Sequence, residues 1–339
     1  MSGRWQITRQ ASRWLTWVAW CDLLLMVTLW LALQYAQEQW WPLAMLLFAP
    51  RWLAALPTAF LVPLAVWRRR RALLPLMLAG GVVAGPLMGF NLPLKETVGS
   101  GSHHIRVLSY NILGGWYNAE EFAALLRESA IDVAALQECP DALRLPVPAG
   151  WQVVRHGGLA VLSRYPIVSY NATELQQKTE LWPETHLLQA VIQTPKGAVD
   201  VCSLHLPSPR FGLQALLDRR TLVRPSRRQL FDQQIAGRWF VAGNLADTIG
   251  TLKPPVILAG DFNTPVESNL YKRYWNGYAN AFSATGWGYG FTQRVSVGGL
   301  SFGVRIDHIL VGKGLKPLSC RVGRDIGSDH LPLIADIGW

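Results

Sequence analysis

The sequence predicts an α/β domain preceded by three transmembrane helices, and two observations support this. The first 92 residues hold three long apolar runs, whereas strand-like and helical segments alternate from residue 105 onward. In addition, the 339-residue chain is 50% hydrophobic and only 16% charged, whereas a typical soluble domain has about 25% charged residues. This composition excludes a disordered chain and disfavours a purely soluble protein.

Three apolar segments are each long enough to cross a hydrocarbon core of about 30 Å. They are Trp14–Leu33, Pro42–Trp67 and Ala72–Leu92. A cleaved signal peptide has a single apolar stretch of about 7–15 residues, which does not match three runs. Residues 1–92 are therefore predicted to form a three-helix transmembrane anchor, residues 93–104 a flexible linker, and residues 105–339 a separate domain.

Basic residues flank these apolar segments unevenly. Arg4, Arg9 and Arg13 precede the first segment, and four consecutive arginines, 68–71, separate the second from the third. Because Lys and Arg favour the cytoplasmic side of a membrane, we expect both groups to be cytoplasmic and the following domain to be extracytoplasmic. The short chain and the dense positive-inside signal suggest a bacterial inner membrane, with the domain in the periplasm.

Most of the net charge of +10 lies beside the apolar segments, since the first 95 residues carry nine basic and two acidic residues. It therefore indicates topology rather than nucleic-acid binding.

Two charges fall inside the spans. Asp22 and Arg51 are predicted to form an ion pair, unless each side chain extends to a membrane interface instead. Gly81, Gly85 and Gly89 share one helix face, which predicts close helix packing within the chain or a homo-oligomer through the third helix.

Eight strand-like runs follow the linker. They are Ile105–Ile112, Val133–Gln137, Leu159–Leu162, Leu187–Gln193, Val199–Leu206, Val256–Ala259, Ile306–Val311 and Leu331–Ile337. A helix is predicted over Ala119–Ser129, because Asn118 is a favourable N-cap and Glu121 stands at the N3 position. A second helix is predicted from Ser226 towards Ala246.

Polar motifs stand at the ends of these strands. They are Ser109–Ile112, Leu136–Glu138, Ser203–Leu206, Ala259–Asn263, Arg305–Ile309 and Gly327–Pro332. Because burying an unpaired carboxylate is costly, carboxylates at several strand ends suggest that they converge on one site. The motifs supply carboxylates, histidines and amides: Glu138, Asp261, Asp307 and Asp329, His205 and His330, and Asn111 and Asn263.

The four cysteines are scattered without CxxC spacing, which excludes a zinc module or a disulfide scaffold. Carboxylates without cysteine suit Mg²⁺ or Mn²⁺ better than zinc. A hard metal, a histidine base and amide donors together describe the hydrolysis of a phosphate ester.

In this order the motifs resemble those of the endonuclease/exonuclease/phosphatase superfamily, over about Ile105 to Ile337. The resemblance implies a four-layer α/β sandwich, in which two packed sheets are flanked by helices and the site lies at one end. It also implies a metal-dependent phosphodiesterase, phosphatase or nuclease. By the same resemblance, Glu138 is the main metal ligand with Asn111 beside it, and Asp329 binds or tunes the metal.

The resemblance also implies the roles of the remaining site residues. His330 would be the general base, and Asp307 would orient it. Asp261 and Asn263 would position the nucleophile and a phosphate oxygen, and His205 would contact the phosphate. His308, which follows Asp307, is interpreted as a neighbour on the strand.

The substrate class is narrowed by location and charge. An extracytoplasmic site has no access to genomic DNA, and the domain is nearly neutral. The stretch from Arg210 to Arg238 holds seven arginines. Three roles are open for them: binding a phosphate-rich substrate, with Arg210 as a substrate-binding residue, contacting anionic lipid, or forming a solvated helix face.

The predicted function is hydrolysis of a phosphoester in a lipid headgroup or in extracytoplasmic nucleic acid by a membrane-anchored enzyme. The alternative is a catalytically silent membrane receptor or scaffold that keeps the fold for binding. Retention of the residues Glu138, Asp261, Asp307 and His330 disfavours that alternative.

Overall fold

The structure is a computed structural model that describes residues 2–35, 41–93, 104–175, 185–217, 225–253, 255–297 and 299–339. It divides into two compact units. One comprises Met1–Asn91 and Glu267–Asn269, and the other Leu92–Val266 and Leu270–Trp339. Residues 94–103, most of the expected linker, lie outside the described residues.

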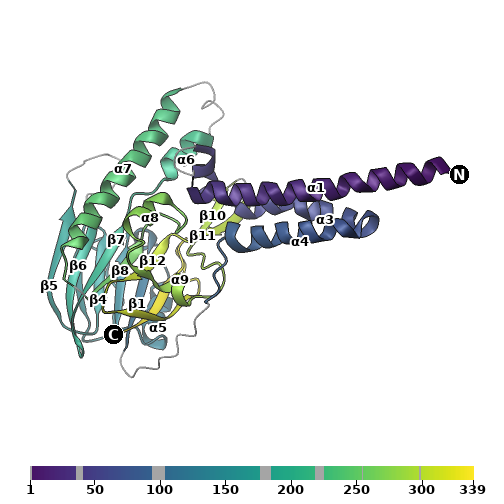
Figure 1. Cartoon of the computed structure of the whole chain (residues 1–339). Helices are drawn as coiled ribbons and strands as arrows, with labels where there is room; N and C mark the ends of the chain where they lie inside the picture. The colour runs from purple at the N-terminus through teal and green to yellow at the C-terminus, as the bar shows by residue number, and fades with distance from the viewer. Residues whose placement is uncertain are drawn as a thin grey trace. The chain divides into compact units, whose positions relative to one another are not determined.

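The helical unit begins with α1 (Ser2–Tyr35), a single long helix (Figure 1). Its segment Arg13–Tyr35 is long and apolar enough to cross a membrane, and it contains the first expected span. The remaining elements are α2 (Trp41–Leu47), η1 (Arg51–Ala55), α3 (Leu56–Arg68), η2 (Arg70–Ala72), α4 (Leu73–Val82) and the π-helical turn η3 (Val83–Leu87). Apolar side chains of α1 pack against α3 and α4.

The prediction of three continuous spans is wrong for the described residues. Only α1 is a single helix long and apolar enough to cross a membrane, and a second crossing exists only if the bent pair Trp41–Leu47 and Arg51–Arg68 counts as one broken span. The second expected span, Pro42–Trp67, breaks near Pro50 into helices bent by 103°. Proline lacks an N–H and restricts the residue before it, which ends α2. In the third, Ala72–Leu92, the stretch Leu73–Leu87 covers about 22 Å at 1.5 Å per residue.

The predicted Asp22–Arg51 ion pair is also wrong, because the structure gives each charge another partner. Asp22 accepts a hydrogen bond from Oγ1 of Thr58 at 2.6 Å. Arg51 donates to the backbone oxygens of Leu47 at 2.9 Å and Leu87 at 3.1 Å. Helix ends leave carbonyl oxygens without intrahelical donors, and the break that the sequence pattern missed supplies such acceptors to Arg51.

The second unit contains two six-stranded sheets and a separate hairpin. The first sheet has the order β13-β14-β1-β2-β4-β3, with bounds Lys316–Val322, Leu333–Gly338, His104–Asn111, Val133–Gln137, Leu159–Ser163 and Gln152–His156. The second has the order β5-β6-β7-β8-β12-β9, with bounds Ile167–Glu174, Thr185–Thr194, Gly197–His205, Val256–Asp261, Asp307–Val311 and Ala279–Asn280. The hairpin is β10 (Gln293–Val297) and β11 (Leu300–Val304).

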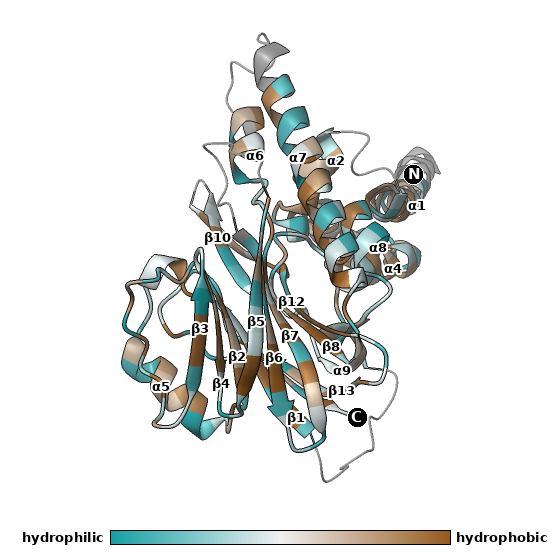
Figure 2. Ribbon diagram, turned by 90° about the vertical axis from the view of Figure 1, so that its left-hand side faces the viewer, coloured by the Kyte–Doolittle hydropathy of each residue, from teal (hydrophilic) through white to brown (hydrophobic). Residues whose placement is uncertain are grey.

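The helices of this unit are η4 (Leu113–Gly115), α5 (Ala119–Glu128), α6 (Arg210–Leu217), α7 (Pro225–Gly250), α8 (Asn269–Tyr274) and α9 (Ala281–Thr285). Helix α5 covers the outer face of the first sheet, and α7 and α8 cover that of the second (Figure 2). One buried apolar cluster fills the space between the sheets, a second lies under α5, and a third lies under α7 and α8. The expected four-layer α/β sandwich is confirmed.

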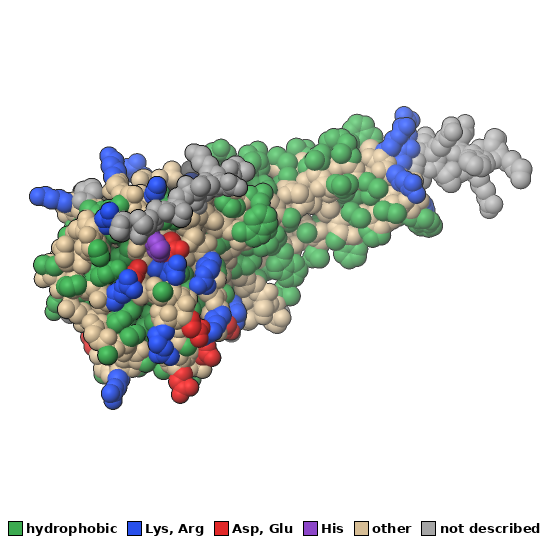
Figure 3. All heavy atoms as spheres, turned by 90° about the horizontal axis from the view of Figure 1, so that it is seen from below, with side chains coloured by type: hydrophobic (Ala, Val, Ile, Leu, Met, Phe, Trp, Pro, Cys, Tyr) green, Lys and Arg blue, Asp and Glu red, His purple; other side chains and the backbone are tan. Residues whose placement is uncertain are grey.

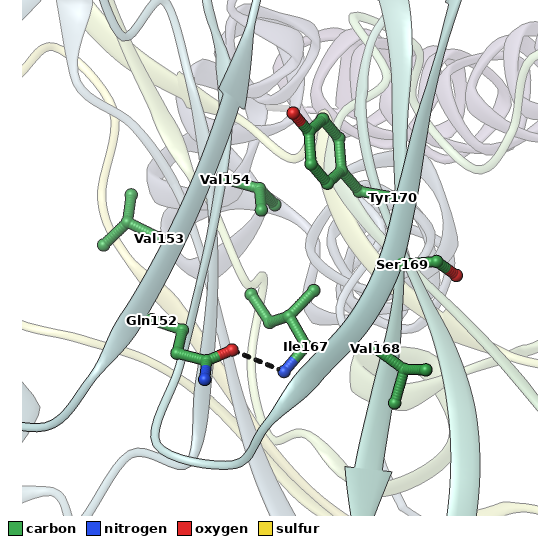
Figure 4. A pocket seen from close by; sticks show the side chains of 7 residues that line it. All are labelled: Gln152, Val153, Val154, Ile167, Val168, Ser169 and Tyr170. Atoms are coloured by element: carbon green, nitrogen blue, oxygen red, sulfur yellow. Dashed lines mark hydrogen bonds between the residues drawn. The ribbon is translucent and has the colours of Figure 1, made fainter.

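Local signals in this unit also match the structure. Asn118 caps α5, and its Oδ1 accepts the N–H of Glu121 at 3.0 Å. The helix expected from Ser226 is α7. An open groove of about 620 Å³ lies between the edge strands β3 and β5, where Oε1 of Gln152 accepts the N–H of Ile167 (Figure 4). None of the predicted site residues lines this groove.

Candidate active site

The strand topology gathers the polar motifs at one end of the sandwich. Strands β1 and β2 are parallel, as are β7 and β8, so their carboxyl ends lie at common edges. Asn111 ends β1, Glu138 follows β2, and His205 and Asp261 end β7 and β8 as register partners. Antiparallel β12 starts at Asp307, directly opposite Asp261. Residues more than 190 positions apart in sequence therefore share one site.

Asp261 lies at the centre of this cluster and is 1% exposed. Its Oδ2 accepts from Nδ2 of Asn111 at 3.1 Å, and its Oδ1 accepts the N–H of Asn263 at 2.8 Å. The Nε2 atoms of His205 and His330 each lie 3.7 Å from Oδ2. One carboxylate thus contacts four predicted site residues from four different elements.

Asp307 and His330 form a buried pair. Nδ1 of His330 lies 2.9 Å from Oδ2 of Asp307, so that the other ring nitrogen, Nε2, faces Asp261. Oγ1 of Thr292 accepts the N–H of Asp307 at 3.0 Å, and the N–H of Leu331 donates to the backbone oxygen of Thr292 at 2.6 Å. Thr292, which the sequence analysis did not single out, therefore fixes the backbone on both sides of the pair.

Glu138 and Asn111 form the more open side of the cluster. Nδ2 of Asn111 donates to Oε1 of Glu138 at 3.0 Å, and Oδ1 of Asn111 accepts the N–H of Leu113. Nε2 of His205 lies 3.8 Å from the same Glu138 oxygen. The Glu138 side chain is 37% exposed, whereas that of Asp261 is 2% exposed.

Two site residues adopt left-handed backbone conformations. Glu138 has φ +51° directly after β2 ends, and Asn263 has φ +48° two residues after β8 ends. Such conformations cost roughly 1–3 kcal/mol for residues other than glycine, and they persist where surrounding contacts hold them. Gly260 precedes Asp261 for a steric reason, since a Cβ there would lie 2.0 Å from the backbone oxygen of Leu204.

The electrostatics of the cluster favour a bound cation. Burial and the nearby Asp307 carboxylate raise the pKa of Asp261. Burial alone would lower the pKa of His330, but the carboxylates of Asp307 and Asp261 outweigh it and raise that pKa to about 10. The raised pKa of His330 shows that the carboxylates around it favour a positive charge at this position, even though it is buried.

The donor set fits a divalent metal ion. Asp261, Asp307 and His330 each offer a ligand atom, and these atoms lie within 4.8 Å of one another. Oδ1 of Asp307 is buried and accepts no hydrogen bond from the described residues. Carboxylate oxygens are the ligands that Mg²⁺ and Mn²⁺ prefer. The sequence predicted Glu138, Asn111 and Asp329 as ligands, and Glu138 and Asn111 adjoin the same cluster.

Asp329 and Arg210 are less closely tied to the cluster. Oδ1 of Asp329 lies 3.5 Å from Oγ of Ser328, and its charge acts on the adjacent His330. Arg210 lies exposed at the start of α6, where its backbone N–H donates to Oγ of Ser208. Among the described residues, no contact joins the Arg210 guanidinium to the cluster.

The structure adds residues that sequence reasoning missed. His186 on β6 is buried, its Nδ1 lies 2.9 Å from the backbone oxygen of His205, and burial lowers its pKa. Oγ of Ser328 accepts the N–H of His330 at 3.2 Å. His308 lies between rings of the outer core, with Nε2 at 2.8 Å from the backbone oxygen of Thr264, in agreement with its interpretation as a strand neighbour.

The fold and this cluster define a phosphoesterase of the two-sheet α/β sandwich class. The sequence profile of the Endonuclease/Exonuclease/phosphatase family matches residues 108–330. The chain therefore belongs to this family, whose members include nucleases and phosphatases. Among curated protein sequences, none matches this chain significantly.

Solved structures share the fold. TDP2 from D. rerio, complexed with a single-strand DNA product, is similar at 14% identity and a TM-score of 0.50, covering 70% of this chain and 99% of its own. The 3′ phosphatase NExo from Neisseria, bound to a product DNA hairpin, has 20% identity, a TM-score of 0.49, and coverages of 69% and 100%. A family protein from Beutenbergia cavernae DSM 12333 has 18% identity, a TM-score of 0.49, and coverages of 69% and 71%. At these identities the likeness concerns the fold.

Proposed function

We propose that this protein is a membrane-anchored, divalent-metal-dependent phosphodiesterase or phosphatase. The observation that carries the proposal is the buried Asp307–His330 pair, whose free ring nitrogen faces Asp261. An imidazole held at one nitrogen by a carboxylate is oriented to accept a proton at the other. Because the neighbouring carboxylates raise the pKa of His330 to about 10, the ring carries both protons near neutral pH when no metal is bound. Its action as a base therefore requires a divalent cation beside these carboxylates, which would lower that pKa.

Each residue then has a part in the reaction. His330 takes a proton from the attacking water at Nε2, while Asp307 holds its Nδ1–H and stabilises the resulting imidazolium. Asp261 and Asn263 orient the nucleophile and a phosphate oxygen, and His205 contacts the phosphate. A bound Mg²⁺ or Mn²⁺, held by Glu138 with Asn111 and Asp329 beside it, would stabilise charge that develops on the phosphate.

The membrane part of the proposal is supported by the surface of the helical unit. Large hydrophobic side chains point outward from α1, α3 and α4, among them Trp17, Phe60 and Met77. Figure 3 shows hydrophobic side chains over this unit, with basic side chains at one end. Arg13 and Arg69 line one pocket there, as expected if both lie on the cytoplasmic side.

We also propose a bacterial inner membrane with the catalytic domain in the periplasm. This orientation requires the chain to cross back after Arg69 through α4 and η3, which together cover about 22 Å. Fusing a reporter that is active only outside the cytoplasm to the C-terminus tests this orientation. Activity of the fused reporter supports a periplasmic domain, and its absence in a well-expressed fusion contradicts it. The predicted face of three glycines is wrong at Gly89, which lies beyond the helix with φ +76°. A Cβ at Gly81 or Gly85 would meet no other atom within 4 Å, so we propose that these two glycines pack between copies.

The proposed substrate is a phosphoester of a lipid headgroup or of extracytoplasmic nucleic acid. The silent-receptor alternative is disfavoured because the residues needed for chemistry are present and in contact. The test is product release from plasmid DNA, RNA, sphingomyelin, phosphatidylglycerol, a phosphoinositide and bis-p-nitrophenyl phosphate, with Mg²⁺ or with a chelator. Metal-dependent cleavage that His330→Ala abolishes supports the proposal. No cleavage by folded, Mg²⁺-supplied protein would favour the receptor.

A further inference from the structure

Helix α7 carries a buried arginine that contacts two loops of the site. Arg238 is 6% exposed, although the sequence places it in an arginine-rich stretch that suggests a solvated face. Its Nη2 donates to the backbone oxygen of Asn263 and to Oγ1 of Thr264, both at 2.7 Å. Its Nε donates to the backbone oxygen of Pro207 at 3.0 Å. One guanidinium therefore joins the segments that leave β7 and β8.

The segment after β8 needs such support because its backbone is strained. Asn263 has φ +48°, and its Nδ2 donates to the backbone oxygen of Leu206 at 2.8 Å and to Oδ2 of Asp261 at 3.2 Å. The N–H of Leu206 in turn donates to the backbone oxygen of Asp261. The two loops thus hold one another through Asn263, and Arg238 holds both from the helix side.

We propose that Arg238 is a positioning residue, which fixes the loops after β7 and β8 and thereby the placement of Asp261 and Asn263. Arg238 acts through the backbone oxygens of Pro207 and Asn263 and the hydroxyl of Thr264. The planar guanidinium suits three acceptors in fixed directions, whereas a lysine ammonium is a single flexible point charge. The kinetic consequence of this placement rests on the proposed phosphoester hydrolysis.

The kinetic test compares Arg238→Ala, Arg238→Lys and, as a control, Arg273→Ala, which removes an exposed arginine of α8. Hydrolysis of bis-p-nitrophenyl phosphate is measured with Mg²⁺. Since displacement of catalytic groups by about 1 Å costs on the order of 100-fold in rate, both Arg238 variants should lose kcat on that scale with little change in KM. The control should retain wild-type kcat.

Chemical rescue separates positioning from loss of stability. Free guanidinium at low millimolar concentration should restore part of the kcat of folded Arg238→Ala, whereas sodium chloride of equal ionic strength should not. A wild-type kcat in folded Arg238→Ala, or equal restoration by sodium chloride, would overturn the proposal. If Arg238→Ala does not fold, Arg238→Lys keeps the buried charge, and a wild-type kcat in that variant is the overturning result.

Hydrogen exchange gives a readout that does not depend on activity. The amides of Leu206 and Asn263 both donate to Asp261, so peptides that contain them should exchange faster in Arg238→Ala than in Arg273→Ala. Unchanged exchange in both segments overturns the positioning role. If the wild type cleaves no substrate but these segments lose protection, the hydrolase proposal fails while the structural part of this one stands.

Discussion

The candidate site has a buried side and an open side, and the two differ in what can reach them. Asp261, Asp307 and His330 are at most 3% exposed, and contacts from several strands fix their geometry. Glu138 is 37% exposed at its side chain, and Trp116, on the turn beside it, is 79% exposed. Buried groups with fixed geometry suit proton transfer, whereas exposed groups are accessible to an exchangeable cation and to substrate. Substitutions on the two sides should therefore change different kinetic parameters.

The largest effect is expected on the buried side. His330→Ala removes the proposed base, and general acid–base catalysis contributes about 10²–10⁴-fold to rate. We expect kcat for bis-p-nitrophenyl phosphate to fall by about 10³-fold. A nearly unchanged half-saturating Mg²⁺ concentration would assign His330 to chemistry, whereas a raised one would assign it to the ligand set with Asp261 and Asp307. The kcat of Asp307→Asn should fall almost as far, because a neutral amide does not stabilise the imidazolium form of His330.

Thermal unfolding is the control for these two variants, because both remove a buried polar group. A kcat within about tenfold of wild type in folded His330→Ala, well short of the full acid–base contribution, would assign the base to another residue. His205 is then the alternative, since its Nε2 also lies 3.7 Å from Asp261.

A smaller and different effect is expected on the open side. Glu138→Gln removes a negative charge from the proposed metal site and keeps the size of the side chain. The half-saturating Mg²⁺ concentration should rise by about 10–100-fold, and saturating metal should restore most of kcat. Titrating activity with Mg²⁺ measures this, with Glu174→Gln on β5 as a control for loss of an exposed carboxylate. A loss of kcat that metal does not restore would place Glu138 on the chemical side.

Stability should depend on pH through the buried side. The pKa of His330 is about 10 in the folded protein, against 6.5 for an unperturbed histidine. Because the folded value is higher, the protonated ring stabilises the fold fully below about pH 6.5, and that contribution is lost as pH rises through about 10. With chelator present, the unfolding free energy of wild type relative to His330→Gln should fall over this range.

Divalent metal should weaken this dependence, because a cation beside Asp261 and Asp307 opposes protonation of the ring. Urea unfolding between pH 6 and 10, with chelator or with Mg²⁺, measures both effects. If plots of unfolding free energy against pH are parallel for wild type and His330→Gln in chelator, the raised pKa of His330 is contradicted. If the unfolding free energy falls with pH equally steeply with and without Mg²⁺, the cation binds away from these carboxylates.

The sequence predicted the strand-end motifs well because each one is local. An apolar strand followed by a polar residue is visible within about six positions. Parallel pairing brings His205 and Asp261 to one edge of the second sheet, and packing of the two sheets places Asn111 of the first sheet beside them. Thr292 and Arg238 were not predictable in this way. Their roles depend on backbone atoms that only the folded chain brings near, and neither side chain belongs to a strand-end motif.

The helical unit was predicted less well for a related physical reason. Hydropathy identifies which residues avoid water, but it does not locate the end of a helix. The break near Pro50 shortened the second expected span. Arg51 pairs with Glu267 at 3.0 Å and donates to the backbone oxygen of Leu47 at the break, and does not bind Asp22. The prediction that Arg51 lies in an apolar segment was correct, and only its predicted partner was wrong.

The smallest predicted effect concerns substrate contact on the open side. Trp116 follows three successive left-handed residues, Leu113, Gly114 and Gly115, with φ of +48°, +67° and +100°. The N–H of Gly114 donates to the backbone oxygen of Glu138 at 2.9 Å, so this strained turn is fixed to the site. Of these three residues only Leu113 is strained by its positive φ, since glycine adopts such angles freely. The exposed Trp116 indole stands on this fixed turn beside Glu138, so we expect it to contact substrate.

Trp116→Ala should therefore raise KM by about tenfold, equivalent to about 1.4 kcal/mol, and leave kcat near wild type. That pattern means that the indole binds the ground state and the transition state equally. Tyr170→Ala, which removes an exposed aromatic ring from the edge strand β5, is the matched control and should change neither parameter. If kcat falls while KM stays constant, the turn belongs with the buried side, and the division of the site into a binding side and a chemical side is wrong at this position.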